Sequence, residues 1–379
     1  MSDTRAANGT PDKPYIGGQA VIEGVMMRSP ASFAIAVRRA DGSIDVRERP
    51  VTKRASAAAK LPLVRGVATL VESLRLGSEA LRFSAERMEA DWPEDEAQAK
   101  PKAKKGAGVA SVLGAFGVSL ANLATRADAD PAGGDDGGRA PNGMAILTIV
   151  MVLFLVALPQ LLAWGVQALF HWDLDVASGR FQLLTGTFKL LVVVGYLGAI
   201  RRVAEIRRVF QYHGAEHKTI STYEAAEPLD VEHARSKTTL HPRCGTTFLV
   251  LTVLVSILVY TALTPLMPKV AWPGWQKQLT FFLIKLPFLP VLAAVTFELQ
   301  RFTARYCLTG PLRALLWPGF LIQKITTIEP DDGQLEIALA SMRATLWRER
   351  VGTDVATDAE IVSFASYQEL VSAPALRPG

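Results

Sequence analysis

Four long apolar stretches limit the possible folds of this chain more than any other feature. They lie at residues 144–170, 181–200, 245–266 and 278–298. Each approaches or exceeds the roughly 20 apolar residues that an α-helix needs to cross the hydrocarbon of a bilayer. Because 49% of all residues are hydrophobic, a membrane protein is the first class to consider. The sequence predicts a polytopic α-helical membrane protein with about four transmembrane helices.

The distribution of basic residues predicts how these helices are oriented. The connection at 201–244 holds eight Lys and Arg residues, whereas the connections at 171–180 and 267–277 hold one and two. Loops rich in Lys and Arg stay on the cytoplasmic side. The first residues have no apolar core typical of a secretory signal peptide. We therefore expect both termini and the 201–244 connection to be cytoplasmic.

Charge and cysteine content limit the partners. The net charge of +5 is modest and the basic residues cluster beside the apolar stretches, so the expected partner is the lipid bilayer and not a nucleic acid. The protein partners are left open. The only cysteines, Cys244 and Cys307, fall on the predicted cytoplasmic side, where thiols stay reduced.

Composition and periodicity divide the chain into seven regions. Alternating segments around the turn residues Asp41 and Gly42 predict a β-meander, and apolar residues at helical spacing follow it. Near the C-terminus, Asp331 is expected to cap one helix, and Thr357 with Glu360 to cap another. The predicted regions are a disordered N-terminus at 1–14, the meander and an amphipathic helix at 15–88, a flexible linker at 89–142, a transmembrane hairpin at 144–200, a cytoplasmic loop at 201–244, a second transmembrane hairpin at 245–298 and cytoplasmic C-terminal helices at 299–379.

The stretch HGAEH carries the clearest chemical signal. It places His213, Glu216 and His217 in the H-x-x-E-H order of the inverted zincins. Histidines four residues apart on a helix present both imidazoles on one face, where they can hold Zn²⁺ beside Glu216 as a base. That face also carries apolar residues, so we expect both histidines to point inward. The alternative is that they are buried histidines bonded to carboxylates or carbonyls.

A catalytic zinc ion also needs a third protein ligand and an open position for water. The stretch HPRCG offers His241 and Cys244, and a helix beginning at Gly245 would favour the Cys244 thiolate. The alternative is that this stretch only shapes the start of the next helix. A straight continuation past Ile200 would carry His213 about 20 Å beyond the apolar boundary. A shared site therefore requires the chain to bend after Ile200.

Carboxylates are the other source of a third ligand. The candidates are Glu23, Glu224, Glu227, Glu232 and Glu298. A carboxylate beside the membrane core is costly, which favours a functional role for Glu298. Its alternative role is an ion pair with Arg301 or Arg305.

Several segments together resemble the YqhQ-like family of bacterial membrane proteins, whose members are of unknown function. They are GGQAVIEGVMMRSP, LVRGVATLVESLRLGSEAL, VFQYHGAEHKTISTYEA, TLHPRCGTTFL, FELQRFTAR and LIQKITTIEPDDGQLEIAL. The resemblance implies a metal-dependent enzyme in the inner membrane of a bacterium. It favours His213, Glu216, His217, His241 and Cys244 as site residues and adds Glu23 and Glu298. The sequence departs from the family in its longer 89–142 linker and in Phe297, where a tyrosine is expected.

Three functions are compatible with these features. The first is a zinc-dependent hydrolase facing the cytoplasm, in which His213 and His217 bind the metal, His241 or Cys244 completes the site and Glu216 activates water. The second is a membrane scaffold or regulator braced by a structural metal or histidine cluster. The third is a small transporter, suggested by Lys189, Lys285 and Glu298 in or near the apolar stretches.

Overall fold

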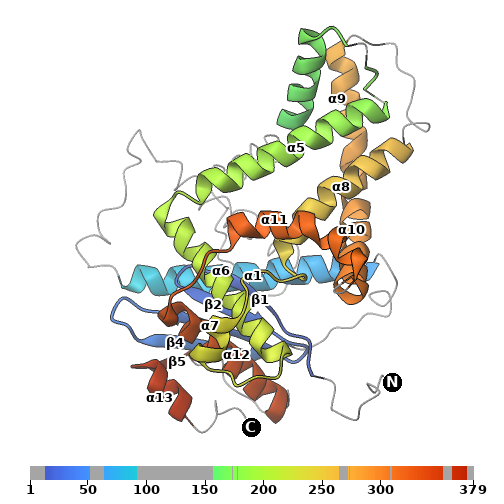
Figure 1. The fold of residues 1–379 in the computed structure, drawn as a ribbon. Coiled ribbons are helices and arrows are strands. Elements are labelled where there is room, and N and C mark those ends of the chain that lie inside the picture. The colour runs from blue at the N-terminus through green and yellow to red at the C-terminus, as the bar shows by residue number, and fades with distance from the viewer. Residues whose placement is uncertain are drawn as a thin grey trace, which may run out of the picture.

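A computed structural model describes most of the chain. The described residues are 13–51, 64–91, 157–172, 174–176, 178–263, 272, 274–307, 310–352 and 361–373. The predicted linker at 89–142 and the predicted disordered N-terminus at 1–14 therefore lie almost wholly outside them. In Figure 1, the long apolar helices occupy the upper part of the molecule and a β-sheet with its helices the lower part.

The sheet has five antiparallel strands in the order β1-β2-β3-β4-β5. The strands are β1 (Gly17–Val21), β2 (Gly24–Arg28), β3 (Ser32–Arg38), β4 (Ile44–Pro50) and β5 (Ile361–Phe364). The first four confirm the predicted meander. The turn between β3 and β4 contains Gly42 at φ 89°, a backbone conformation that glycine adopts without a steric penalty.

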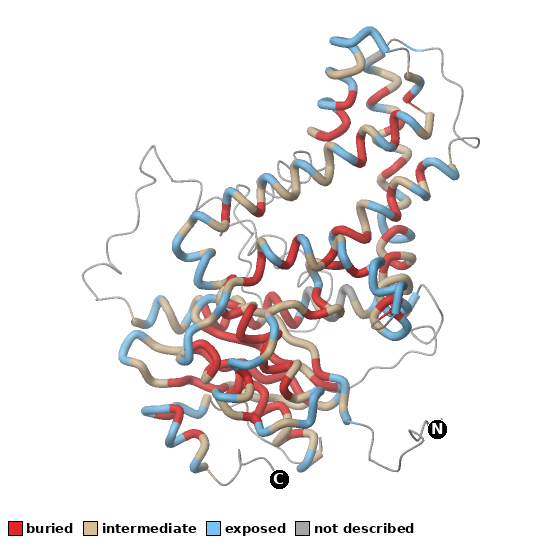
Figure 2. Tube along the Cα trace, viewed as in Figure 1, coloured by how far each residue is buried: buried red, intermediate tan, exposed pale blue. Residues whose placement is uncertain are grey.

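Helices cover both faces of this sheet. Helix α1 (Val64–Ala90) packs Leu76 and Phe83 against one face. Helices α6 (Ala204–Glu224) and α12 (Asp332–Val351) share a core with the other face, where Leu335 and Tyr212 are buried. Because both faces are covered, the six residues of β3 from Ser32 to Val37 are all buried. Figure 2 shows buried residues concentrated in this part of the molecule.

Within the described residues, three helical segments are long and apolar enough to cross a membrane. They are α5 (Gly179–Ile200), α8 (Gly245–Leu263) and the segment Trp275–Tyr306, which contains α9 (Gly274–Lys285), η3 (Leu286–Phe288) and α10 (Leu289–Tyr306). Large apolar side chains on them are exposed, including Leu258, which is 70% exposed. Such surfaces match a lipid environment. Most of the predicted first span at 144–170 lies outside the described residues, and its described part is helical from residue 157 to 169.

Four shorter helices complete the labelled elements of the described chain. They are α7 (Val231–Ser236), η4 (Pro311–Leu316), α11 (Trp317–Thr326) and α13 (Tyr367–Ser372). Helix α5 ends at Ile200, and after a three-residue turn α6 begins in a different direction (Figure 1). This is the bend that a shared site requires. Helix α11 packs against α8 and α5.

The C-terminal prediction was partly wrong. Asp331 caps α12 through a capping box with Gln334, as predicted. The helix expected from Thr357 and Glu360 is not formed, because Ile361–Phe364 instead pairs with β4 as strand β5. The free edge of β4 supplies hydrogen bonds that the sequence of this segment cannot reveal. The next helix begins later, where the Ser366 side chain accepts a hydrogen bond from the Glu369 backbone N–H.

A buried ion pair between α12 and β4 generates a stability prediction. Arg348 is fully buried, and its guanidinium donates to both oxygens of Glu48 at 2.8 and 2.7 Å. The substitution Glu48→Ala should lower the free energy of unfolding by about 3 kcal/mol, because it leaves a buried charge without this partner. The thermal midpoint of the purified protein measures the change.

The control is Asp332→Ala, which breaks an ion pair with Arg235 in which both side chains are 58% exposed. It should cost less than about 1 kcal/mol. Equal midpoints for the two variants would contradict a stabilising role for the buried pair.

Candidate functional site

Helix α6 carries the HGAEH stretch, and its glycine has a packing role. A Cβ added to Gly214 would lie 2.1 Å from the backbone oxygen of Ile328. The Ile328 N–H donates to the carbonyl of Phe210 at 3.0 Å, so the chain after α11 runs directly against α6. The absence of a side chain at residue 214 permits this approach. It also brings the Thr326 carbonyl to the ring of His213.

Backbone carbonyls fix the orientation of both histidines. His213 Nδ1 lies 2.9 Å from the carbonyl oxygen of Thr326, and His217 Nδ1 lies 2.5 Å from that of Thr239. Since a carbonyl oxygen can only accept, each Nδ1 carries the hydrogen. In a neutral ring the lone pair is then on Nε2. Metal-binding histidines in proteins are held in this way by their second ring nitrogen.

Cys244, the residue before α8, lies beside both histidines. His213 Nε2 lies 3.2 Å from Cys244 Sγ. Ligand atoms of His213, His217 and Cys244 all lie within 4.8 Å of one another. His217 Nε2 is buried and has no hydrogen-bond partner among the described residues. A buried polar atom without a partner is costly, and a metal ion would satisfy this one.

The electrostatics of these groups suit metal ligands. Burial raises the pKa of the Cys244 thiol, but His217 and the hydroxyl and N–H of Thr246 lower it below its ordinary value overall. Burial and the neighbouring His213 lower the pKa of His217, which keeps this imidazole neutral. A thiolate and neutral imidazoles are the forms that bind Zn²⁺.

His241 lies beside this cluster and is held by other partners. Its ring centroid is 5.7 Å from that of His217, and its Nε2 lies 3.4 Å from Glu224 Oε2. The Gln323 side chain accepts from the His241 backbone N–H and donates to its carbonyl oxygen. Burial lowers the pKa of His241 to about 4. Of the two predicted third ligands, the geometry therefore favours Cys244.

Glu216 faces strand β1 from the same turn of α6. It is 5% exposed, and burial raises the pKa of its carboxyl group to about 8, although the Ala20 backbone N–H donates to it. A Cβ on Gly18 would lie 2.7–2.9 Å from the Glu216 side chain. The absence of a side chain at Gly18 of β1 thus makes room for this carboxyl group.

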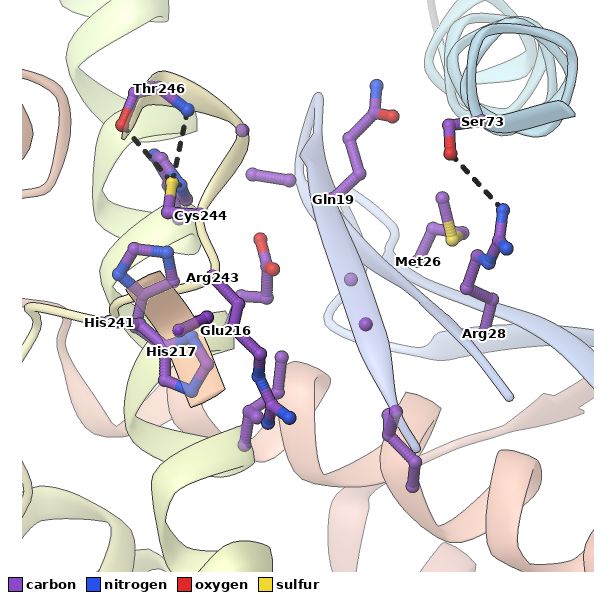
Figure 3. Close-up of a pocket in the computed structure, with 18 of the residues that line it drawn as sticks. Gln19, Met26, Arg28, Ser73, Glu216, His217, His241, Arg243, Cys244 and Thr246 are labelled. Carbon is purple, nitrogen blue, oxygen red and sulfur yellow. Dashed lines mark hydrogen bonds between the residues drawn. The ribbon is translucent and has the colours of Figure 1, made fainter. Parts of the chain in front are cut away.

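All of these groups line one cavity of about 1,090 Å³. Figure 3 shows His217, Cys244 and Glu216 on one side, opposite Gln19 and Met26 on the strands. The end of α10 adds part of the wall. Its lining residues include Phe297, Gln300, Arg301, Ala304 and Arg305. The cavity therefore lies between the sheet and the apolar helices.

The predicted carboxylate ligands lie elsewhere. Glu23, at φ 50°, pairs with Arg208 at 2.5 Å and accepts from the Tyr212 hydroxyl at 3.2 Å. Glu298 pairs with Arg65 of α1 at 2.7 Å, and not with Arg301 or Arg305 as its alternative role required. Neither carboxylate lines the cavity. Both link helices to neighbouring elements of the fold.

Two other loop carboxylates are also engaged. Glu224 pairs with Arg243, and Glu227 pairs with Lys237. Glu232 lies in the first turn of α7 and, like them, does not line the cavity.

The lysines that suggested a transporter form a separate polar cluster. Lys285 Nζ donates to Gln182 Oε1 at 3.1 Å. The ammonium groups of Lys189 and Lys285 lie 5.5 and 5.2 Å from the centroid of the Tyr260 ring. Neither lysine lines the cavity. The cluster shares no described contact with His213, His217 or Cys244.

Sequence reasoning missed the supporting partners of the site. The carbonyls of Thr239 and Thr326 carry no side-chain signal, because any residue presents the same backbone group. Arg301 and Arg305, near the end of α10, follow an apolar stretch in the sequence. Basic residues at such a position are typical of a membrane boundary and do not by themselves indicate a cavity. Their place in the cavity depends on contacts between distant segments.

Comparisons with known proteins agree with the family resemblance. Residues 61–348 match the family described as Protein of unknown function (DUF1385). The chain is 32% identical over 336 residues to the Uncharacterized protein YqhQ of Bacillus subtilis (strain 168), covering 88% of this chain and 92% of that protein. No solved structure matches the chain.

The close approach at Gly214 generates a prediction for the site. Gly214→Ala should lower the free energy of unfolding by about 1–3 kcal/mol, because the new methyl group overlaps the Ile328 carbonyl. It should also displace Thr326 from His213. The thermal midpoint measures the first effect. Gly198→Ala is the control, since an added Cβ there meets nothing within 4 Å. A midpoint of Gly214→Ala equal to that of the control would contradict this packing role.

Proposed function

The chain belongs to the DUF1385 family of proteins of unknown function, and we propose that this member is a membrane-embedded, metal-dependent hydrolase. One observation carries the proposal. Two imidazoles, each held through Nδ1 by a backbone carbonyl, direct Nε2 atoms toward Cys244 Sγ at the wall of a large cavity. Two imidazoles and one thiolate suit Zn²⁺ and leave its fourth position for water, as catalytic zinc sites require.

The roles of the residues follow from their places. His213, His217 and Cys244 hold the ion, which when bound supplies Lewis acidity and lowers the pKa of water. Glu216 lines the same cavity, and its pKa of about 8 in the metal-free chain suits proton transfer near neutral pH. It accepts a proton from the attacking water and returns it to the leaving group. Burial of these groups excludes bulk water from the reacting atoms.

Metal content tests the ligand assignment. The purified wild-type protein should contain one equivalent of zinc by elemental mass spectrometry, and the His213→Ala/His217→Ala variant should contain less than about a tenth of that, since two of three ligands are gone. Cys244→Ala should also lose metal, whereas His241→Ala should retain it. Absence of zinc from wild type prepared without chelators would overturn the assignment.

Glu216→Gln separates an enzyme from a scaffold with a structural metal. The amide cannot accept a proton as the carboxylate does, so this variant should keep its zinc and fail to correct the defect caused by deleting the gene. Glu232→Gln, the same substitution at an exposed carboxylate of α7 that does not line the cavity, is the control for expression and insertion. Full function of Glu216→Gln would rule out Glu216 as the base.

The folded sheet also supports four membrane crossings. Helix α6 packs on β1, and α12 packs on β2, β3 and β4, so these elements must lie on one side of the membrane. The chain between β4 and α6 must then cross an even number of times. Helix α5 supplies one crossing, and the apolar stretch at 144–170 supplies the other. The α8 and α9–α10 segments form the second pair, with both termini and the site in the cytoplasm of a bacterial cell.

Labelling with a membrane-impermeant maleimide tests this topology. A cysteine at Trp272, between α8 and α9, should react in intact cells, whereas one at Asp41, in the turn between β3 and β4, should react only after permeabilisation. Trp272 is 55% exposed, and the native Cys244 and Cys307 are both buried. Labelling of both positions in intact cells would contradict the four-crossing arrangement.

A further inference from the structure

The walls of the cavity differ in chemistry from the metal-ligand cluster. Four arginines line it, namely Arg28, Arg243, Arg301 and Arg305, and the only acidic residue of the described lining is Glu216. One carboxyl group can offset at most one of these four positive charges. The cavity is therefore strongly cationic beyond the metal-ligand cluster.

The four arginines are not equally neutralised. Arg28 lies 3.4 Å from Glu72, and Arg243 pairs with Glu224. Arg301 and Arg305 form no ion pair with any residue that the structure describes. They lie four residues apart on α10 and both line the cavity, so they present two guanidinium groups from neighbouring turns. Two such groups match the oxygens of a phosphate.

Apolar side chains line other parts of the cavity. They are Ile16, which precedes β1, Met26 of β2, Phe210 of α6 and Phe297 of α10. Phe297 and both arginines belong to the segment Trp275–Tyr306, which is long and apolar enough to cross a bilayer. A cavity of about 1,090 Å³ is large enough for a drug-sized molecule and far exceeds the volume of a phosphate ion. The walls thus suit a molecule with an anionic head and an apolar tail.

We propose that the cavity binds a phosphate-bearing amphiphile, whose phosphate contacts Arg301 and Arg305 and whose apolar chain lies along Phe210 and Phe297. This inference rests on the proposed hydrolase and names its substrate class. The position of the arginines at the end of a membrane-crossing segment gives such a molecule access from the bilayer, where anionic headgroups gather beside cationic side chains.

Binding to the full-length protein in a neutral detergent tests the proposal without turnover. The probe is dioctanoyl phosphatidic acid, and microscale thermophoresis measures its dissociation constant. The Arg301→Gln/Arg305→Gln variant should bind it about tenfold or more weakly, because charge-assisted hydrogen bonds to the phosphate are lost. The control is Arg202→Gln/Arg207→Gln. It removes two cations that follow the end of α5 and do not line the cavity. It should bind like wild type.

Three further probes identify the part of the ligand that is recognised. Dioctanoylglycerol lacks the phosphate, decanoic acid carries a single carboxylate and inorganic phosphate lacks the tail. Weaker binding of all three supports the proposal. Equal binding of dioctanoylglycerol or decanoic acid would overturn the phosphate assignment, and equal binding of inorganic phosphate would point to a soluble phosphate compound and overturn the amphiphile.

The outcome is independent of the metal test. An unchanged dissociation constant in the Arg301→Gln/Arg305→Gln variant would overturn this inference, even if zinc is present in one equivalent. Conversely, loss of binding in that variant with no zinc in wild type would support the amphiphile site and overturn the hydrolase.

Discussion

The arrangement of the site depends on two hydrogen bonds from imidazole rings to backbone carbonyls. The bonds to Thr326 and Thr239 set the tautomer and direction of His213 and His217, and so place both Nε2 lone pairs near Cys244. A different part of the fold positions each of these two carbonyl groups. Thr326 is brought in where the chain after α11 runs against Gly214, and Thr239 lies in the connection between α7 and α8. The cluster is therefore assembled from three segments that are distant in sequence.

The same helix that carries the histidines joins the two parts of the molecule. Helix α6 packs on β1 and α12, and Phe210 near its centre is buried with Leu197 of α5 and Val250 of α8. The ion pair between Arg65 and Glu298 makes a second link, from α1 to α10. With a link on each side, the cavity has one wall from the sheet and another from an apolar helix. A molecule in this cavity can thus contact polar and apolar surfaces at the same time.

Local signals predicted much of this arrangement. The spacing in HGAEH predicted that both histidines share a helical face, and Asp331 and Gly42 marked a helix start and a turn correctly. The need for a third ligand pointed to HPRCG, and Cys244 does lie beside His213. The carbonyls of Thr239 and Thr326 could not be predicted, because every residue presents the same backbone group. Glu298 illustrates this limit, since its partner is Arg65 and not an arginine on its own helix. Strand β5 was mistaken for helix for the same reason, as its structure depends on the edge of β4.

The position of β5 beside β4 has a consequence for the order of synthesis. The ribosome completes β1–β4 before any of the apolar helices, but α12 and β5 emerge only after the last of them. Until then, one face of the meander lacks α12 and the edge of β4 is open to other strands. A chain that stalls before this point would leave the sheet unfinished and prone to aggregation. Completion of the sheet thus requires that all of the apolar helices have already been synthesised.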